Sequence, residues 1–370
     1  MGDQTAGVQT ASADPLRAVS DIWTRALGPK GRDPNANLLH IGVGTKRILR
    51  LLDEIETAFG VKLPIGAALK LGTVEALAKA IKTGRWPGPS PLLLLKDGSD
   101  SHPPLYLIAG AWGIILETCN LASATNHPGK IWGLQPPGFD GDEASLDSVQ
   151  GIASHYVAHL SGATDHPVNV VGFSFGGVIA LEMARVLRRQ NRRIGLVGLI
   201  DTPLAERRWP FATRARYLWA RSKARLRGLL NVHGERRKDA IRNIVRPLRN
   251  RILGMFFTRP SFASAYQPTL DIRLKAVLDN IIVANETYIP TLIEVPMVLF
   301  KARPVSGDVV DAEELWRPYI PELEVVEVDG RHGNMIRPPL VNGLAAAIAA
   351  RLTGSEPASP ADRIVPAEPA

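Results

Sequence analysis

A short glycine-rich segment, GFSFGG at residues 172–177, constrains the fold of this chain more than any other feature. An apolar run of strand length precedes it at 168–172, and apolar residues with helical spacing follow at 177–190. A Gly-x-Ser-x-Gly turn between a strand and a helix is typical of a nucleophile elbow, where glycines permit a tight turn. The pattern therefore predicts that Ser174 is a nucleophile exposed at the carboxyl end of a strand.

The sequence around this turn alternates between strand-like and helical segments. We expect helices at 177–190 and 340–352, and strands at 104–109, 130–134, 168–172, 194–200, 295–301 and 324–328. Such alternation predicts an α/β fold, with a mostly parallel sheet covered by helices on both faces.

A serine hydroxyl is a poor nucleophile until a base removes its proton, and His332 is the best-placed histidine for this role. It follows the expected strand 324–328 through Asp-Gly-Arg, so it lies in a loop at the carboxyl end of a strand. His155 and His159 are spaced i, i+4 on an expected helix, but no third ligand accompanies them, so we expect no metal site. Cys119 is the only cysteine, which excludes an internal disulfide and a cysteine-cluster metal site.

A carboxylate is expected beside the base, because it fixes the imidazole tautomer and stabilises its charged form. Asp201 directly follows the strand 194–200. Asp308 and Asp311 are its rivals, since they follow the strand 295–301 and also precede His332. The residues alone favour Asp201 and leave both rivals open.

The oxyanion of an acyl-transfer reaction needs two backbone N–H donors. One is expected from Phe175, the residue after the nucleophile. The other is expected from the loop GAWG at 110–113, where Ala111 is our choice and Trp112 is the alternative.

With these motifs in place, residues 90–352 resemble the thioesterase domains that end nonribosomal peptide and polyketide synthases, within the α/β-hydrolase superfamily. Besides the serine turn, the resemblance covers WGLQ at 132–135, GFDG at 138–141, LIDT at 199–202 and the histidine loop at 329–336. It implies an α/β-hydrolase fold with a helical lid, and it supports Asp201 as the acid. The loop AGAWG at 109–113 departs from the family, which usually begins this loop with His-Pro or His-Gly.

The N-terminal region is similar to an acyl or peptidyl carrier domain. A helical apolar stripe spans 48–59, and it is followed by FGVKLP at 59–64 and TVEALA at 73–78. In such a carrier, a serine at the start of the long second helix receives phosphopantetheine. Thr45 occupies that position here, and we expect it to be unmodified and to cap its helix, with loading of its hydroxyl as the alternative.

Composition divides the chain further. Disordered ends are expected at 1–13 and 354–370, a carrier-like helical domain at 14–84, a linker rich in Pro, Gly and Ser at 85–103, and the thioesterase-like domain at 104–353 with its lid at about 204–290. Neither a secretory signal nor a membrane span is recognisable, so we expect a cytoplasmic protein.

Positive charge is concentrated in the expected lid. Residues 206–260 contain 16 Lys and Arg against three acids, mostly at amphipathic helical spacing. Attraction of an acidic carrier protein in trans, of the phosphates of CoA or phosphopantetheine, or of an anionic membrane surface competes with simple solvation. Nucleic acid is not an expected partner, because no binding motif accompanies the charge.

The resemblance implies release of an acyl or peptidyl group from a phosphopantetheine thioester, through an acyl-serine and without a cofactor. The length leaves no room for an adenylation or condensation domain, so a separate carrier or acyl-CoA is expected to supply the substrate. Two alternatives remain open: an acyltransferase acting on an amine or hydroxyl, and a non-catalytic adaptor that binds carriers.

Overall fold

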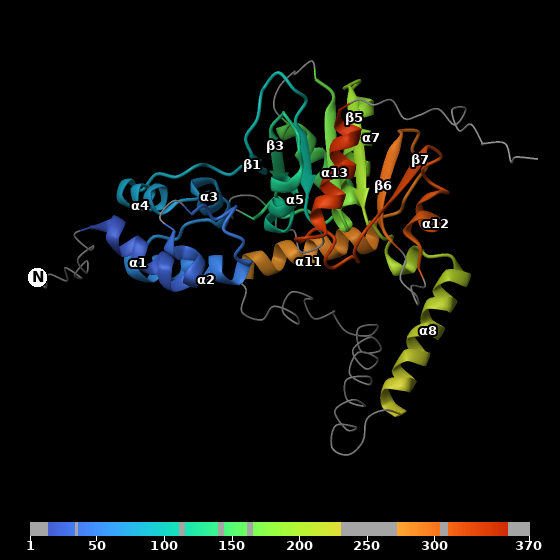
Figure 1. Cartoon of the computed structure of the whole chain (residues 1–370), viewed down its shortest axis with the longest axis horizontal. Coiled ribbons are helices and arrows are strands. Elements are labelled where there is room, and N and C mark those ends of the chain that lie inside the picture. Colours follow the sequence, from blue (N-terminus) through green and yellow to red (C-terminus); the bar gives the residue numbers. More distant parts are fainter. Residues whose placement is uncertain are drawn as a thin grey trace, which may run out of the picture.

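The computed structural model describes residues 14–33, 36–110, 115–139, 144–160, 166–230, 272–303 and 310–353. A helical domain (residues 14–84) lies at one end of the molecule, beside an α/β domain (residues 92–353) built on a twisted sheet (Figure 1). The expected disordered ends, 1–13 and 354–370, lie outside the described residues.

The helical domain packs around the apolar stripe that the sequence predicts. Its elements are α1 (Pro15–Leu27), η1 (Gly28–Arg32), α2 (Thr45–Phe59), α3 (Ile65–Leu71) and α4 (Val74–Thr83). Ile48, Leu51 and Ile55 are fully buried along one face of α2, and burial of each such side chain stabilises the fold by about 1.5–3 kcal/mol. The helix ends at Gly60, whose left-handed φ of 68° suits a residue without a Cβ.

Most of the sheet is parallel, and its strands follow the order β1-β3-β2-β4-β5-β6-β7 among the residues that the structure describes. Every strand expected from the sequence is present within two residues of its predicted ends. The strands are β1 (Leu92–Lys96), β2 (Leu105–Ile108), β3 (Ile131–Leu134), β4 (Val168–Phe173), β5 (Ile194–Ile200), β6 (Met297–Ala302) and β7 (Leu323–Val328).

Burial along the strands explains their sequences. Every residue of the central strand β4 is buried, because helices cover both faces of a parallel sheet, and its sequence is almost continuously apolar. The edge strand β7 is instead buried only at its two ends, Leu323 and Val328. The carboxyl end of β4 thus lies at the centre of the sheet, where Ser174 follows it.

The predicted linker at 85–103 is wrong in part, because β1 lies within it. Leu92 pairs with Leu134, and β1 runs antiparallel to β3 at the edge of the sheet. The flanking prolines at 87–91 and 103–104 favour breaks on either side, but the leucine run between them contains no breaker. A strand of four leucines therefore fits between two proline-rich turns.

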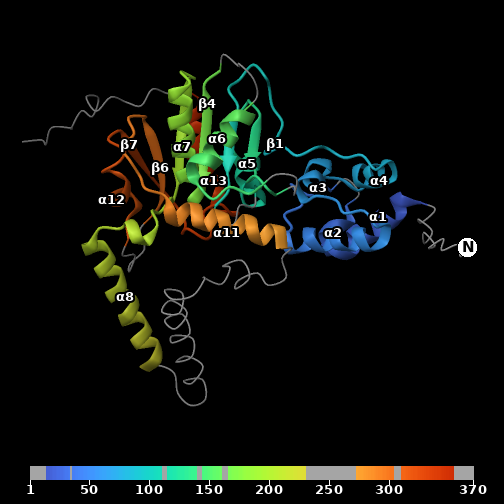
Figure 2. The same ribbon diagram turned by 180° about the vertical axis from the view of Figure 1, so that it is seen from behind.

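Helices cover both faces of the sheet. On one face α5 (Cys119–Ala124) packs against α13 (Val341–Leu352), and on the other α6 (Val149–His159) packs against α7 (Phe175–Arg189), as the two opposite views show (Figures 1 and 2). The short elements η2 (Ile115–Thr118), η3 (Glu206–Arg208) and α12 (Ala312–Trp316) complete the domain.

Two helices are described within the expected lid. The helix α11 (Ile272–Thr287) lies across the carboxyl edge, where Ile281 borders a small cavity together with Gly110 and Phe175. The basic helix α8 (Phe211–Leu230) extends away from the sheet in both views (Figures 1 and 2). Of the helices in the described ranges, none is long and apolar enough to cross a membrane.

Candidate active site

Ser174 lies in a strained turn between β4 and α7. Its φ of 55° and ψ of −123° place it outside the helical and extended regions, a geometry that is costly for a residue with a Cβ and is typical of functional turns. A Cβ on Gly172 would overlap the backbone of Gly176, and one on Gly176 would overlap the carbonyl of Ala109. Both glycines are therefore required for the close approach that presents Ser174.

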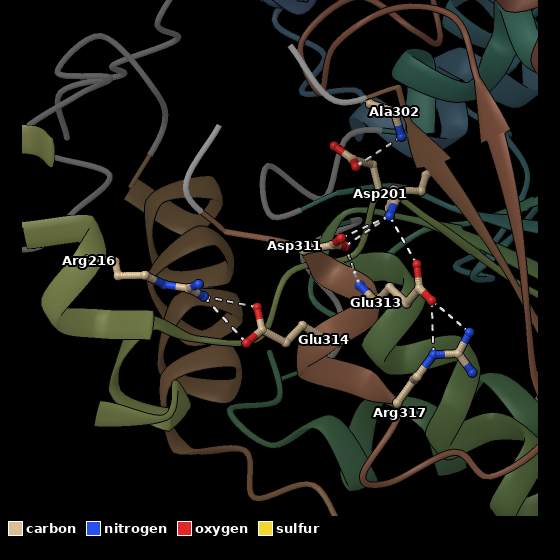
Figure 3. A network of polar contacts seen from close by, with 8 residues as sticks. Asp201, Arg216, Ala302, Asp311, Glu313, Glu314 and Arg317 are labelled. Carbon is tan, nitrogen blue, oxygen red and sulfur yellow. Dashed lines mark hydrogen bonds and ion pairs between the residues drawn. The ribbon is translucent and has the colours of Figure 1, made fainter. Parts of the chain in front are cut away.

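Asp201 is positioned by the strand that lies next to β4. It follows β5 at a φ of 41°, and its backbone N–H donates to the carbonyl of Phe300 in β6 over 2.9 Å. Its Oδ1 accepts a hydrogen bond of 3.4 Å from the Ala302 N–H (Figure 3). These backbone contacts hold the other carboxylate oxygen toward the loop after β7.

The imidazole of His332 contacts this second oxygen of Asp201. Its Nδ1 lies 2.7 Å from Asp201 Oδ2, which favours the tautomer with the proton on Nδ1 and leaves Nε2 to act as a base. The imidazole also stacks on Phe173, the residue before Ser174, with 5.1 Å between ring centroids and 25° between planes. Carboxylate and aromatic ring thus orient the imidazole from two sides.

One rival acid, Asp311, forms contacts away from His332. Asp311 lies 3.0 Å from Lys301 Nζ, and its Oδ1 accepts from the Glu313 N–H at the start of α12 (Figure 3). The other rival, Asp308, lies outside the described residues. Of the described candidates, the structure brings Asp201 to His332 and holds Asp311 in a separate ion-pair cluster.

A cavity of about 750 Å³ joins the two domains at this site. Ser174 and His332 line it from the α/β domain, and Leu39, Val43 and Thr45 line it from the helical domain. Thr45 and the candidate nucleophile therefore line the same cavity.

The expected capping role of Thr45 is wrong. The N-cap of α2 is Gly44, and Thr45 is the first residue of the helix. A residue at that position has helical backbone angles, so it is not in the extended conformation in which a threonine hydroxyl reaches back to the second or third N–H. Its partly buried side chain instead lines the cavity.

Glu117 lines the same cavity, although the sequence interpretation did not single it out. It lies in η2, and its carboxylate accepts a hydrogen bond from the backbone of Gly110. Burial raises the pKa of this carboxyl, while the Gly110 contact and the charges of Arg337 and His332 oppose the rise. The only signal in the sequence is a lone acid in the apolar stretch 114–119, which is too common to indicate a site.

The two expected oxyanion donors differ in what the structure describes. Phe175 is the first residue of α7, where a backbone N–H has no acceptor within its own helix. Ala111 and its alternative Trp112 lie outside the described residues.

The remaining candidate groups are a histidine pair and the single cysteine, Cys119, which lines the cavity. His155 and His159 lie with 4.4 Å between ring centroids and 44° between ring planes, and the described residues contain no group of three potential metal ligands. Burial raises the pKa of the Cys119 thiol to about 12, so this thiol stays protonated and is a poor nucleophile at neutral pH.

Comparison with known families separates the chain into the same two domains. Residues 103–242 match the family model of thioesterase domains, and residues 17–81 match that of phosphopantetheine attachment sites.

Curated relatives and a solved structure are similar to this chain at low identity. Enterobactin synthase component F of Escherichia coli O157:H7 is 23% identical over 343 residues, which cover 90% of this chain and 24% of that protein. Malpinin synthetase of Mortierella alpina is 24% identical over 188 residues, half of this chain and 2% of its own length. The chain therefore spans at most about a quarter of these two proteins.

Part of the crystal structure of a holo four-domain nonribosomal peptide synthetase bound to AMP and glycine has a similar fold, with a TM-score of 0.54 at 20% identity. The match covers 96% of this chain and 27% of that one. Fold and family matches agree: this chain combines a domain of the phosphopantetheine attachment family with a thioesterase-family domain of the α/β-hydrolase fold.

Proposed function

We propose that this protein cleaves an acyl or peptidyl thioester of phosphopantetheine through an acyl-serine intermediate on Ser174. The observation that carries the proposal is the contact of 2.7 Å between His332 Nδ1 and Asp201 Oδ2, together with the strained turn that presents Ser174 to the same cavity as His332. A structural serine has no need of an oriented imidazole or of a strained backbone.

In the proposed reaction, His332 Nε2 removes the proton of Ser174 as Oγ attacks the thioester carbonyl. The Phe175 N–H and a second donor from the loop at 110–113, with Ala111 as our candidate, stabilise the oxyanion. Loss of one such donor typically slows turnover by about 10²–10³-fold. The imidazolium, stabilised by Asp201, then protonates the leaving pantetheine thiol, and an acyl-Ser174 ester remains for a second nucleophile.

Delivery of the substrate is proposed to occur from outside the chain. Thr45 replaces the serine that a carrier loads, and its β-methyl crowds the hydroxyl. The cavity beside it is bounded by both domains, so an incoming pantetheine arm is proposed to enter between them. The donor is then a carrier protein in trans or an acyl-CoA.

The basic helix α8 is a proposed contact for that donor. Phe211 and Trp219 are 88% and 67% exposed, and the ion pair of 3.1 Å between Arg216 and Glu314 ties the helix to α12 (Figure 3). A cationic helix with exposed aromatic residues suits an acidic carrier surface. An anionic membrane surface is the second partner class that its composition fits.

An acyltransferase remains the second candidate function, because Glu117 adds a carboxylate to the cavity. A non-catalytic adaptor is disfavoured, since such a protein has no use for a Ser–His–Asp arrangement.

The experiment that tests the function is burst-phase hydrolysis of acyl-CoA and acyl-pantetheine thioesters by the wild type and by Ser174→Ala. We expect a burst followed by turnover in the wild type and neither in the variant. Labelling by a fluorophosphonate reports the reactivity of Ser174 independently of the acyl chain. Absence of both turnover and labelling in the folded wild type contradicts the proposal and favours the adaptor.

A further inference from the structure

Glu117 and Ser174 both lie close to one small residue, Gly110. A methyl group built on Gly110 would lie 3.5 Å from Glu117 Oε2 and 3.4 Å from Ser174 Cβ. The Gly110 backbone also donates to the Glu117 carboxylate. A second carboxylate, distinct from Asp201, is therefore held beside the candidate nucleophile, in the cavity where the acyl group must lie.

A negative charge at this position opposes the reaction of a neutral acyl group. An oxyanion develops on the carbonyl carbon attached to Ser174, and a nearby carboxylate repels it in a partly dehydrated site. The charge of Asp201 is instead opposed by the imidazolium of His332, which Asp201 contacts directly. Glu117 contacts Gly110, the first residue of the expected oxyanion loop.

The charged and titratable groups around Glu117 leave its carboxylate able to accept a hydrogen bond from a further donor. Arg337 and His332 are close enough for their charges to act on its carboxyl, but Arg337 is exposed and His332 is already oriented by Asp201. The Cys119 thiol, also on the cavity, is neutral at physiological pH. A carboxylate has room for about four hydrogen bonds, so a cationic or N–H-bearing group in the cavity matches it.

We propose that Glu117 binds the amine of an acceptor molecule, so that the acyl group is transferred from Ser174 to a primary amine and not only to water. The inference rests on the proposed function, because it requires the acyl-serine as donor.

The proposed step balances in atoms and protons. An alkylammonium ion enters, loses one proton to the Glu117 carboxylate and becomes a neutral amine. Its nitrogen attacks the acyl-Ser174 carbonyl and forms the C–N bond, His332 takes the second proton, and the C–O bond breaks as His332 returns that proton to Ser174 Oγ. The products are an amide and free Ser174, and Glu117 releases the first proton to solvent.

The environment of the carboxyl suits proton acceptance. Burial raises the pKa of Glu117, which brings it closer to that of an ammonium ion and makes proton transfer less unfavourable. The same burial strengthens the attraction between the carboxylate and an entering cation. Neither property assists the hydrolysis of a neutral ester by water.

The test compares the wild type with Glu117→Gln and with a matched control, Glu322→Gln, at an exposed residue just before β7. Glutamine keeps an oxygen that accepts the Gly110 N–H, so the loop contact is preserved while the charge is removed. Each protein is acylated with an acyl-pantetheine thioester, and propylamine or propanol is added at equal concentration. The amide, ester and acid products are then quantified.

We expect wild type and Glu322→Gln to form propylamide in excess over the propyl ester. The amide-to-acid ratio should fall at least about tenfold in Glu117→Gln, within the range typical of acid–base groups. An unchanged ratio with lower total turnover overturns the inference and assigns Glu117 only a role in positioning the loop. Absence of wild-type amide above the uncatalysed background also overturns it.

The mass of the protein distinguishes failure of the proposed function from failure of the inference, because it shows whether Ser174 carries an acyl adduct. If the wild type carries no acyl adduct on Ser174, the donor itself is missing and the proposed function fails. If the adduct forms and partitions identically in wild type and Glu117→Gln, only the inference fails.

Discussion

Both domains have buried apolar cores, but the two positions expected to carry function, Thr45 and Ser174, differ in backbone geometry. In the helical domain, Thr45 begins α2 with ordinary helical geometry. In the α/β domain, Ser174 is held at a positive φ that only a tightly packed turn maintains. If Thr45 occupies the position that carriers modify, as we propose, the difference shows that the helical fold does not depend on the residue at that position, because Thr45 lines a cavity and is not part of the core. A strained elbow persists only where the surrounding structure imposes it.

Among the substitutions that keep Ser174, replacing Asp201 by Asn should reduce activity more than any other change. Asparagine preserves the shape but no longer stabilises the imidazolium or its tautomer, so turnover should fall by about 10⁴-fold. Steady-state thioester hydrolysis measures the effect.

The matched control is Asp311→Asn, which removes a carboxylate that contacts Lys301 instead of His332. Its turnover should stay within about threefold of the wild type, as for substitutions outside the reacting groups. A loss in Asp311→Asn comparable to that in Asp201→Asn would show that the acid is assigned to the wrong strand.

Replacing Thr45 by Ser should make the helical domain a substrate for loading with phosphopantetheine. Serine removes the β-methyl that crowds the hydroxyl, so a phosphopantetheinyl transferase with CoA should attach an arm to Thr45→Ser and not to the wild type. Intact-mass spectrometry measures the added arm. Equal loading of both proteins would mean that the helical domain is a working carrier, and the difference between the domains would disappear.

The smallest expected effect is on thermal stability. Because burial raises the pKa of Glu117 in the folded state, its protonated form is favoured there. The associated stability is fully present below the unfolded pKa and is lost as the pH rises through the folded pKa. Glu117→Gln should therefore raise Tm relative to the wild type by up to about 3 °C at pH 7.5, and by less at pH 4.

Thermal unfolding at both pH values checks this prediction, with Glu322→Gln as the exposed control. A Tm difference that is independent of pH, or larger at pH 4, would show that the Glu117 carboxyl is not disfavoured by burial.

The sequence indicates those parts of the candidate site that depend on local signals. The elbow at Ser174 is predicted by its Gly-x-Ser-x-Gly turn. The strands that lead to Asp201 and His332 are predicted by short runs of strand-like sequence. A parallel sheet then brings the carboxyl ends of those strands to one edge. The sequence-based choice of Asp201 over Asp311 agrees with their observed partners.

The parts that were missed depend on packing between distant segments. The strand β1 lies between proline-rich turns, and only its pairing with β3 reveals it. The placement of Thr45 on a cavity shared with Ser174 depends on how the two domains meet. Glu117 belongs to no sequence motif, and only its contact with Gly110 in the folded chain indicates a place in the candidate site.

The central claim is an acyl-enzyme on Ser174, and rapid-quench mass spectrometry tests it most directly. Wild type and Ser174→Ala are mixed with an acyl-pantetheine thioester for one turnover, quenched and digested. The account predicts a transient acyl adduct on the peptide that contains Ser174, absent from the variant, with loss of the adduct matching release of the product. Thioester cleavage with no adduct at any time, or with an adduct on another residue, would contradict it.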